Sequence, residues 1–147
     1  MYKNILVPID GSSLSRAAAK EAVAFAKEQG AKVVGFYVAP EYQPNVYADF
    51  VPASFISPKD YEEMVEKTAE KYLAAVAKAA EAAGVSCTCA HSMSDLPYDA
   101  IIRAAQRHKC DLIFMASHGR SGLAKLLLGS QTSKVLAHSK VPVLVHR

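Results

Sequence analysis

The sequence lacks the features that mark membrane proteins and nucleic-acid-binding proteins. No apolar run approaches the roughly 18 residues that a transmembrane helix requires, so we expect no contact with a membrane. The formal net charge at pH 7 is only +3, and the basic residues are spread along the chain rather than clustered. We therefore expect no nucleic-acid partner.

Cysteine is also scarce. The chain has three cysteines, an odd number, and its first residues lead directly into an apolar segment without room for a signal peptide. Thiols stay reduced in the cytosol. These features predict free cysteines and a cytoplasmic protein.

The common signatures of nucleotide-dependent and hydrolytic enzymes are missing. The chain contains no Gly-x4-Gly-Lys-Ser/Thr motif, and no Gly-x-Gly-x-x-Gly follows the first apolar run. Local spacing places no paired carboxylates, Ser-His-Asp set or Cys-His pair for general catalysis. We expect no catalytic residue and, at most, slow turnover.

What the sequence does contain is an alternation of strand and helix patterns that fits one domain over residues 1–147. Apolar residues make up 51% of the chain and charged residues 21%, and there is no repeat or linker. Apolar runs predict strands at 5–9, 32–38, 85–90, 111–115 and 141–145. Helical patterns lie between Ser13 and Gly30 and over 58–83, 98–108, 123–128 and 131–138. This order predicts an α/β fold, an open parallel five-stranded sheet with helices on both faces, which binds ligands at the carboxyl ends of its strands.

Two of the predicted helices show a clear apolar stripe. The inward-facing residues of these helices are predicted to be Leu14, Ala18, Ala22, Phe25 and Ala26 in the first, and Tyr61, Met64, Val65, Tyr72, Val76 and Ala80 in the second. Between the second strand and the second helix, residues 40–57 hold three prolines and no periodicity. We interpret this segment as a surface excursion and a candidate lid over a ligand site.

The most informative segment follows the fourth predicted strand. It reads Ala116-Ser-His-Gly-Arg-Ser-Gly122, and Gly129-Ser-Gln-Thr132 then opens a helix. Glycine lets backbone N–H groups approach an anion, and a helix N-terminus adds partial positive charge. The segment therefore predicts a phosphate-binding site.

Other residues that can carry chemistry have simpler explanations. Cys87, Cys89 and His91 share one face of a predicted strand, a spacing that permits zinc or copper. No fourth ligand is evident and cysteines on a buried strand usually pack as small hydrophobes, so we predict no metal. Cys110 is expected to pack, and His118 to stabilise its loop or face solvent, since no carboxylate or nucleophile lies beside it locally.

The whole chain resembles the universal stress protein family. The resemblance rests on Ile5-Leu-Val-Pro-Ile-Asp-Gly-Ser12, Phe36-Tyr-Val38, the segment 111–122, Leu128-Gly-Ser130 and the segment 141–145. It implies a Rossmann-like sheet with strand order 3-2-1-4-5 and, in one branch of the family, bound ATP. That branch carries the pattern Gly-x2-Gly-x9-Gly-Ser/Thr. Gly119, Gly129 and Ser130 match the pattern, whereas Ala116 stands at its first glycine.

The resemblance also implies a set of nucleotide-binding residues. Asp10 would meet the ribose or the phosphates, and Val38 would contact adenine. The phosphates would be held by Gly119, Gly122, Gly129 and Ser130, and the other members of the implied site are Pro8, Met115, Ser117, Arg120, Gln131 and Thr132. Simpler roles stay open: Asp10 and Ser130 as helix caps, Val38 and Met115 as core residues, and Arg120 as a solvated charge.

The functional hypotheses differ in whether Ala116 permits nucleotide binding. Its methyl group matters only if the position needs a positive φ or a close approach of backbone to ligand. With the site intact, the protein would be a stress-response regulator, a dimer that binds ATP or another adenine nucleotide, with or without Mg, and turns it over slowly or not at all. The alternatives are a nucleotide-free dimeric interaction module, and a slow ATPase or autophosphorylating protein with Ser130 or Thr132 as the acceptor.

The last predicted strand bears on assembly. An apolar strand at a sheet edge invites pairing, and Pro142 is tolerated there. The resemblance implies a homodimer in which residues 141–146 pair with their twofold mates. An unidentified protein partner would then respond to nucleotide occupancy.

Overall fold

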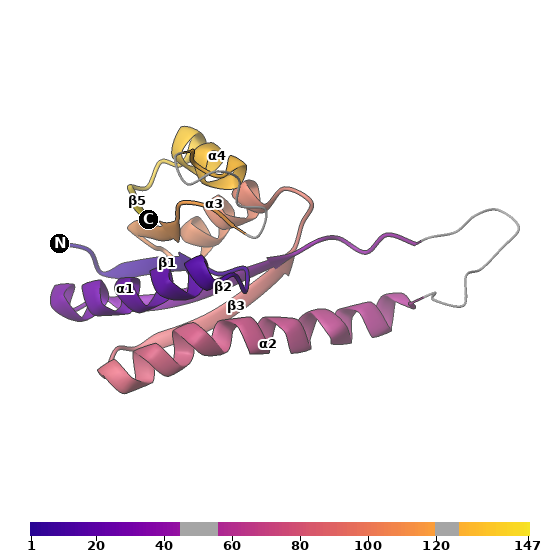
Figure 1. Ribbon diagram of the computed structural model, residues 1–147, viewed down its shortest axis with the longest axis horizontal. Helices are drawn as coiled ribbons and strands as arrows, with labels where there is room; N and C mark the ends of the chain where they lie inside the picture. Colours follow the sequence, from indigo (N-terminus) through magenta and orange to yellow (C-terminus); the bar gives the residue numbers. More distant parts are fainter. Residues whose placement is uncertain (45–55, 120–126) are drawn as a thin grey trace, which may run out of the picture.

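The computed structural model describes residues 1–44, 56–119 and 127–147 (Figure 1). The elements in chain order are β1 (Asn4–Pro8), α1 (Ser13–Gln29), β2 (Lys32–Ala39), α2 (Pro58–Ala83), β3 (Cys87–Met93), α3 (Pro97–Arg107), β4 (Leu112–Ala116), α4 (Ser130–His138) and β5 (Val143–His146). All strand pairs are parallel, in the order β3-β2-β1-β4-β5. The predicted α/β sheet and its strand order are confirmed. The helical piece expected at 123–128 lies almost wholly outside the described residues, as does most of the 40–57 segment.

The sheet is covered on both faces, by α1 and α2 on one side and by α3 and α4 on the other (Figure 1). Ile5 and Val7 of β1 face the first pair of helices, and Leu6 faces the second. All three are 0% exposed. Burial on both faces explains why the inner strands are continuous apolar runs rather than alternating ones.

Helix ends follow the local sequence signals. Ser12 Oγ accepts the backbone N–H of Ser15 at 3.1 Å, and Ser57 Oγ accepts that of Asp60 at 3.1 Å, so both serines are N-caps. Gly30 and Gly84 close α1 and α2 with φ of 66° and 71°, which is the left-handed conformation that favours glycine.

Helix α2 is longer than the strands that it covers. Its 26 residues span about 39 Å, at 1.5 Å a residue, whereas the eight residues of β2 span about 26 Å. The prediction that Met64 faces inward is therefore wrong: it lies near the N-terminal end of α2 and is 45% exposed. Leu73, outside the predicted set, is buried over the middle of the sheet.

Strand β3 differs from its prediction in extent and position. It begins at Cys87 rather than residue 85 and continues to Met93, because it pairs with β2 along the whole length from Val33 to Ala39. It is also an edge strand rather than a buried one, and Cys89 is exposed. The expectation that both of its cysteines pack inside the protein is wrong for Cys89.

Strands β1 and β4 part where a site can form. They pair only where Ile5 lies beside Leu112 and Leu6 beside Ile113, although β1 continues to Pro8 and β4 to Ala116. From β1 the chain continues into α1 on one face of the sheet, whereas from β4 it continues into α4 on the other face. In open α/β sheets such a switch point leaves a crevice at the carboxyl ends of the strands.

One negative finding concerns the helices. In the three described segments, none of them is long and apolar enough to span a bilayer.

Candidate functional site

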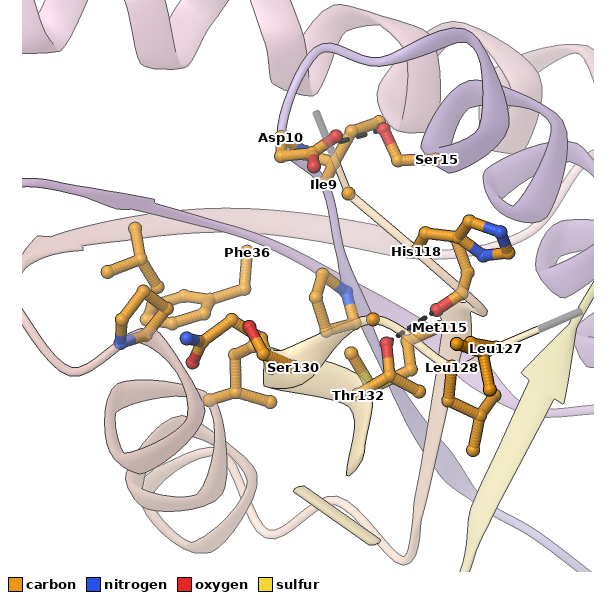
Figure 2. A pocket seen from close by; sticks show the side chains of 18 residues that line it. Ile9, Asp10, Ser15, Phe36, Met115, His118, Leu127, Leu128, Ser130 and Thr132 are labelled. Atoms are coloured by element: carbon orange, nitrogen blue, oxygen red, sulfur yellow. Dashed lines mark hydrogen bonds between the residues drawn. The ribbon is translucent and has the colours of Figure 1, made fainter. Parts of the chain in front are cut away.

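A cavity of about 530 Å³ lies at the carboxyl ends of β1, β2 and β4 (Figure 2). That volume is in the range of small-molecule sites. Nine of the twelve predicted site residues line it: Pro8, Asp10, Val38, Met115, Gly119, Gly129, Ser130, Gln131 and Thr132. Two further predicted residues, Arg120 and Gly122, lie outside the described residues.

The remaining predicted residue, Ser117, is not in the lining. It is 1% exposed, and its Oγ lies 2.7 Å from Nδ1 of His118. Its carbonyl oxygen accepts the N–H of Gly129 at 2.8 Å. Ser117 therefore joins the loop after β4 to the start of α4 instead of facing a ligand.

One wall of the cavity is apolar and comes from three elements. Phe36 and Val38 project from β2, Met115 comes from β4, and Ile101 comes from α3. Phe36 and Met115 are almost fully buried, at 3% and 6% exposed. Such a wall suits a flat apolar ring rather than a charged group.

Another part of the cavity lining, the start of α4, is suited to an anion. Helix α4 has Gly129 as its N-cap, and no side chain caps its first turn. The alternative role of Ser130 as helix cap is not what the structure shows, because Ser130 is already the first helical residue. The first N–H groups of a helix have no carbonyl partner within it and carry partial positive charge. Those of Ser130, Gln131 and Thr132 belong to this turn, at the edge of the cavity.

Close packing explains the two glycines of the pattern. A Cβ atom on Gly129 would lie 3.1 Å from Cα of His118 and 3.3 Å from the carbonyl oxygen of Ser117. A Cβ atom on Gly119 would lie 2.5 Å from Oδ2 of Asp10. Neither glycine has a positive φ. Glycine is therefore favoured at both positions by close packing, at 129 against the backbone of residues 117–118 and at 119 against the Asp10 side chain, and not by turn conformation.

Asp10 lines the same cavity from the loop that follows β1. The helix cap is Ser12, so the alternative role of Asp10 as cap is not what the structure shows. Oδ1 of Asp10 accepts the N–H of Ser12 at 2.9 Å, and the N–H of Asp10 lies 3.4 Å from Oγ of Ser15. These bonds fix the carboxylate at the cavity, with Oδ2 turned toward Gly119.

Two of the lining side chains hold α4 in place. Oε1 of Gln131 accepts the N–H of Tyr98 at 3.0 Å, in the first turn of α3. The hydroxyl of Thr132 donates to the carbonyl oxygen of Ala116 at 3.0 Å (Figure 2), and Thr132 is 2% exposed. Both side chains are thus occupied by protein partners, whereas their backbone N–H groups remain part of the first helical turn.

The position of Ala116 does not require glycine. It is the last residue of β4 and is 6% exposed. Among the described residues other than glycine, only Lys109 has a positive φ. The methyl group of Ala116 is therefore compatible with its backbone, and it forms part of the cavity lining.

Sequence reasoning missed half of the lining. The missed residues are Ile9, Ser15, Phe36, Pro97, Ile101, Ala116, His118, Leu127 and Leu128. Strand periodicity could have found Phe36, which lies two residues before Val38 and so on the same face of β2. Nothing local points to Pro97 or Ile101, because only the packing of α3 brings them to the cavity.

The chain is similar to members of one protein family over its whole length. The model of the universal stress protein family matches residues 1–147. The chain is 36% identical over 145 residues to Universal stress protein MJ0531 of Methanocaldococcus jannaschii, covering 99% of this chain and 82% of that protein.

Solved structures show the same likeness. The structure of protein MJ0577 from the same organism superimposes with a TM-score of 0.80 at 28% identity, covering 99% of this chain and 95% of that one. A universal stress protein in complex with cAMP gives a TM-score of 0.72 at 26% identity, covering 99% and 97%. The chain belongs to the universal stress protein family.

Proposed function

We propose that the cavity binds an adenine nucleotide and that ATP is its physiological form. One observation carries this proposal: an apolar wall and an uncapped helix N-terminus face the same cavity. A nucleotide joins a flat ring to an anion, so it matches both parts of the lining. The relative whose structure contains cAMP supports the same ligand class.

We propose that the apolar wall and the start of α4 would orient the nucleotide. Adenine would pack between Val38 and Met115, on the apolar wall. The phosphates would accept N–H groups from residues 129–132, where the helix dipole favours negative charge. Asp10, which lines the same cavity, would accept a ribose hydroxyl. Its carboxylate also fits a Mg²⁺ ion that is held mainly by phosphate oxygens.

The described lining favours binding over turnover. Its titratable side chains are Asp10 and His118, and Nδ1 of His118 is engaged by Ser117. Of the two acceptors considered for autophosphorylation, Thr132 is buried and its hydroxyl is bonded to Ala116. Ser130 is exposed and is the accessible one. We therefore propose little or no hydrolysis, with Ser130 as the acceptor if a phosphoryl group is transferred.

Nucleotide extraction and calorimetry test the proposal. Purified protein is extracted with acid and analysed for adenine nucleotide, and ATP is titrated into nucleotide-free protein. We expect binding that Gly129→Val weakens at least tenfold, because the new side chain separates α4 from residues 117–118. Ser133→Ala, on an exposed position of α4, is the control. Absence of nucleotide and of heat at millimolar ATP would favour the interaction module instead.

We also propose that the protein is a homodimer joined by β5, whose nucleotide occupancy is read by a protein partner. In support, β5 is an edge strand and Val143, Leu144 and Val145 are only half-buried. An apolar edge with unpaired backbone groups favours antiparallel pairing across a twofold axis. A cytoplasmic location stays a prediction of the sequence.

Light scattering tests the dimer. Val145→Glu places charge on this edge and should give monomers. Thr88→Glu, on the opposite edge strand β3, is the matched control and should leave the mass unchanged. An unchanged dimer in the Val145 variant would rule out this interface.

A further inference from the structure

Two thiols lie together on the edge strand β3, far along the sheet from the nucleotide cavity. Cys87 and Cys89 are two residues apart and project from the same face of the strand. Cys87 is half-buried and Cys89 is exposed. The thiol of Cys87 lies 3.6 Å from the carbonyl oxygen of Thr88, the residue between the two cysteines. Cys87 and Cys89 pair in regular register with Val33 and Gly35 of β2, so their side chains are direct neighbours on one face of the strand.

Their surroundings are apolar and open on one side. Cys89 pairs in register with Gly35 of β2, and a Cβ atom on Gly35 would lie 3.4 Å from its Sγ. The same point is 3.3 Å from Leu73 and 3.4 Å from Val76, both on α2. The thiols therefore face α2, which runs beside β3 in Figure 1. The missing side chain at residue 35 leaves room for the sulfur.

The donor set selects the type of cation. Among the described residues there is no group of three His, Cys, Asp or Glu side chains that could hold a metal ion, so His91 does not complete a site. Structural zinc requires four ligands, and Ca²⁺ and Mg²⁺ require oxygen. Cu(I) is the soft cation that thiolates select, and it forms stable complexes with two sulfur ligands in line.

The strand spacing favours bridging by a metal over a disulfide. Residues i and i+2 of a strand are about 6.6 Å apart, near the upper limit of about 6.8 Å for the Cα atoms of a disulfide. A metal bridge holds the sulfur atoms roughly 4.5 Å apart instead, since a zinc–thiolate bond is about 2.3 Å long and a bond to two-coordinate Cu(I) is slightly shorter. Neighbouring side chains on one strand face reach that separation by leaning toward each other, without bending the strand.

We propose that Cys87 and Cys89 form a two-thiolate binding site for Cu(I) at the β3 edge. Binding replaces the two thiol protons with one cation, so Cu⁺ and two thiols give a singly negative bis-thiolate complex and two protons. No electron is transferred. The site is independent of the nucleotide cavity and of the β5 edge, which lies at the other side of the sheet.

Competition for Cu(I) tests the proposal. Reduced protein is titrated without oxygen into the coloured complex of Cu(I) with bicinchoninate, and the loss of absorbance measures transfer of the ion. We expect one Cu(I) per chain, with X-ray absorption showing two sulfur neighbours. Cys87→Ser and Cys89→Ser should each weaken binding by at least ~100-fold, because the loss of outer-shell partners alone costs 10–100-fold.

The chain provides matched controls. His91→Ala and Cys110→Ser should keep the wild-type affinity, since neither side chain belongs to the pair. Cys89→Ala tests the proposal even if Cys87 variants fold poorly, because Cys89 is exposed, and urea unfolding checks its stability. No transfer of Cu(I) to the wild-type protein, or equal transfer to Cys89→Ala, overturns the proposal.

Discussion

Ala116→Gly restores the first glycine of the family pattern. The structure predicts that this substitution leaves the affinity for ATP nearly unchanged, because Ala116 already permits the site to form. Ala116 lies at the end of β4 and has no positive φ. At this position the backbone therefore needs no conformation that alanine cannot adopt. We expect the affinity for ATP to change less than threefold, which calorimetry on the two proteins can measure.

The same substitution should cost stability. It removes a buried methyl group, worth about 0.8 kcal/mol, and places glycine in a strand, worth about 0.5–1 kcal/mol. We expect the free energy of unfolding to fall by about 1.5 kcal/mol. For a domain of this size the melting temperature should fall by roughly 3–6 °C.

One result would refute this reasoning. If Ala116→Gly binds ATP tenfold more tightly or more, a difference of about 1.4 kcal/mol, then the methyl group obstructs the ligand. In that case the wild-type protein would resemble the nucleotide-free interaction module. A loss of stability without a gain in affinity supports an intact site.

Three further predictions follow from named contacts. Thr132→Val leaves the buried carbonyl of Ala116 without its donor and should lower the free energy of unfolding by about 1–3 kcal/mol in urea; Thr132→Ser is the control, and equal stability of the valine variant would contradict the role of the bond. Gly119→Ala should turn the Asp10 carboxylate away and weaken ATP binding about tenfold, which is about 1.4 kcal/mol. Asp10→Asn should have a similar effect. Unchanged calorimetric titrations of these variants would show that Asp10 does not touch the nucleotide. The rate of alkylation of Cys87 by iodoacetamide should rise with pH through about 7, because the thiolate is the reactive form and the Cys89 side chain lowers the pKa of Cys87 to about 7. Cys89→Ala should move this rise to higher pH. A profile that does not move would exclude Cys89 as the cause of the lowered pKa.

The fold could be predicted because its signals are local. The inner strands are buried on both faces and so appear as apolar runs, and Ser12, Ser57, Gly30 and Gly84 each mark a helix end by chemistry within a few residues. The errors occur where one element extends past another. The exposure of Met64 depends on how far α2 extends past the strands, and the length of β3 depends on its pairing with β2. No local sequence pattern records either relation.

The site was predictable in part for the same reason. Gly119 and Gly129 belong to one short pattern, and both line the cavity. Ser117 was misplaced because it is buried beyond the end of β4, where it contacts His118 and accepts the N–H of Gly129, and these contacts depend on where α4 begins. Ile101 and the bond between Gln131 and Tyr98 could not be predicted, since they depend on the packing of α3 against α4.

The contacts at the end of β4 explain which parts of the glycine pattern can vary. Beyond the last β1–β4 pair, Thr132 donates to the carbonyl of Ala116, and Gly129 donates to that of Ser117. These bonds place the first turn of α4 against the strand end, and Gly129 permits the approach because it has no Cβ. Gly119 makes the corresponding close contact with Asp10. The residue at position 116 contributes to this packing through its carbonyl group, which every amino acid has, and its methyl group lines the cavity without requiring a special backbone conformation. The second and third glycines are thus fixed by packing that builds the site, and the first is the position where an alanine leaves that packing intact.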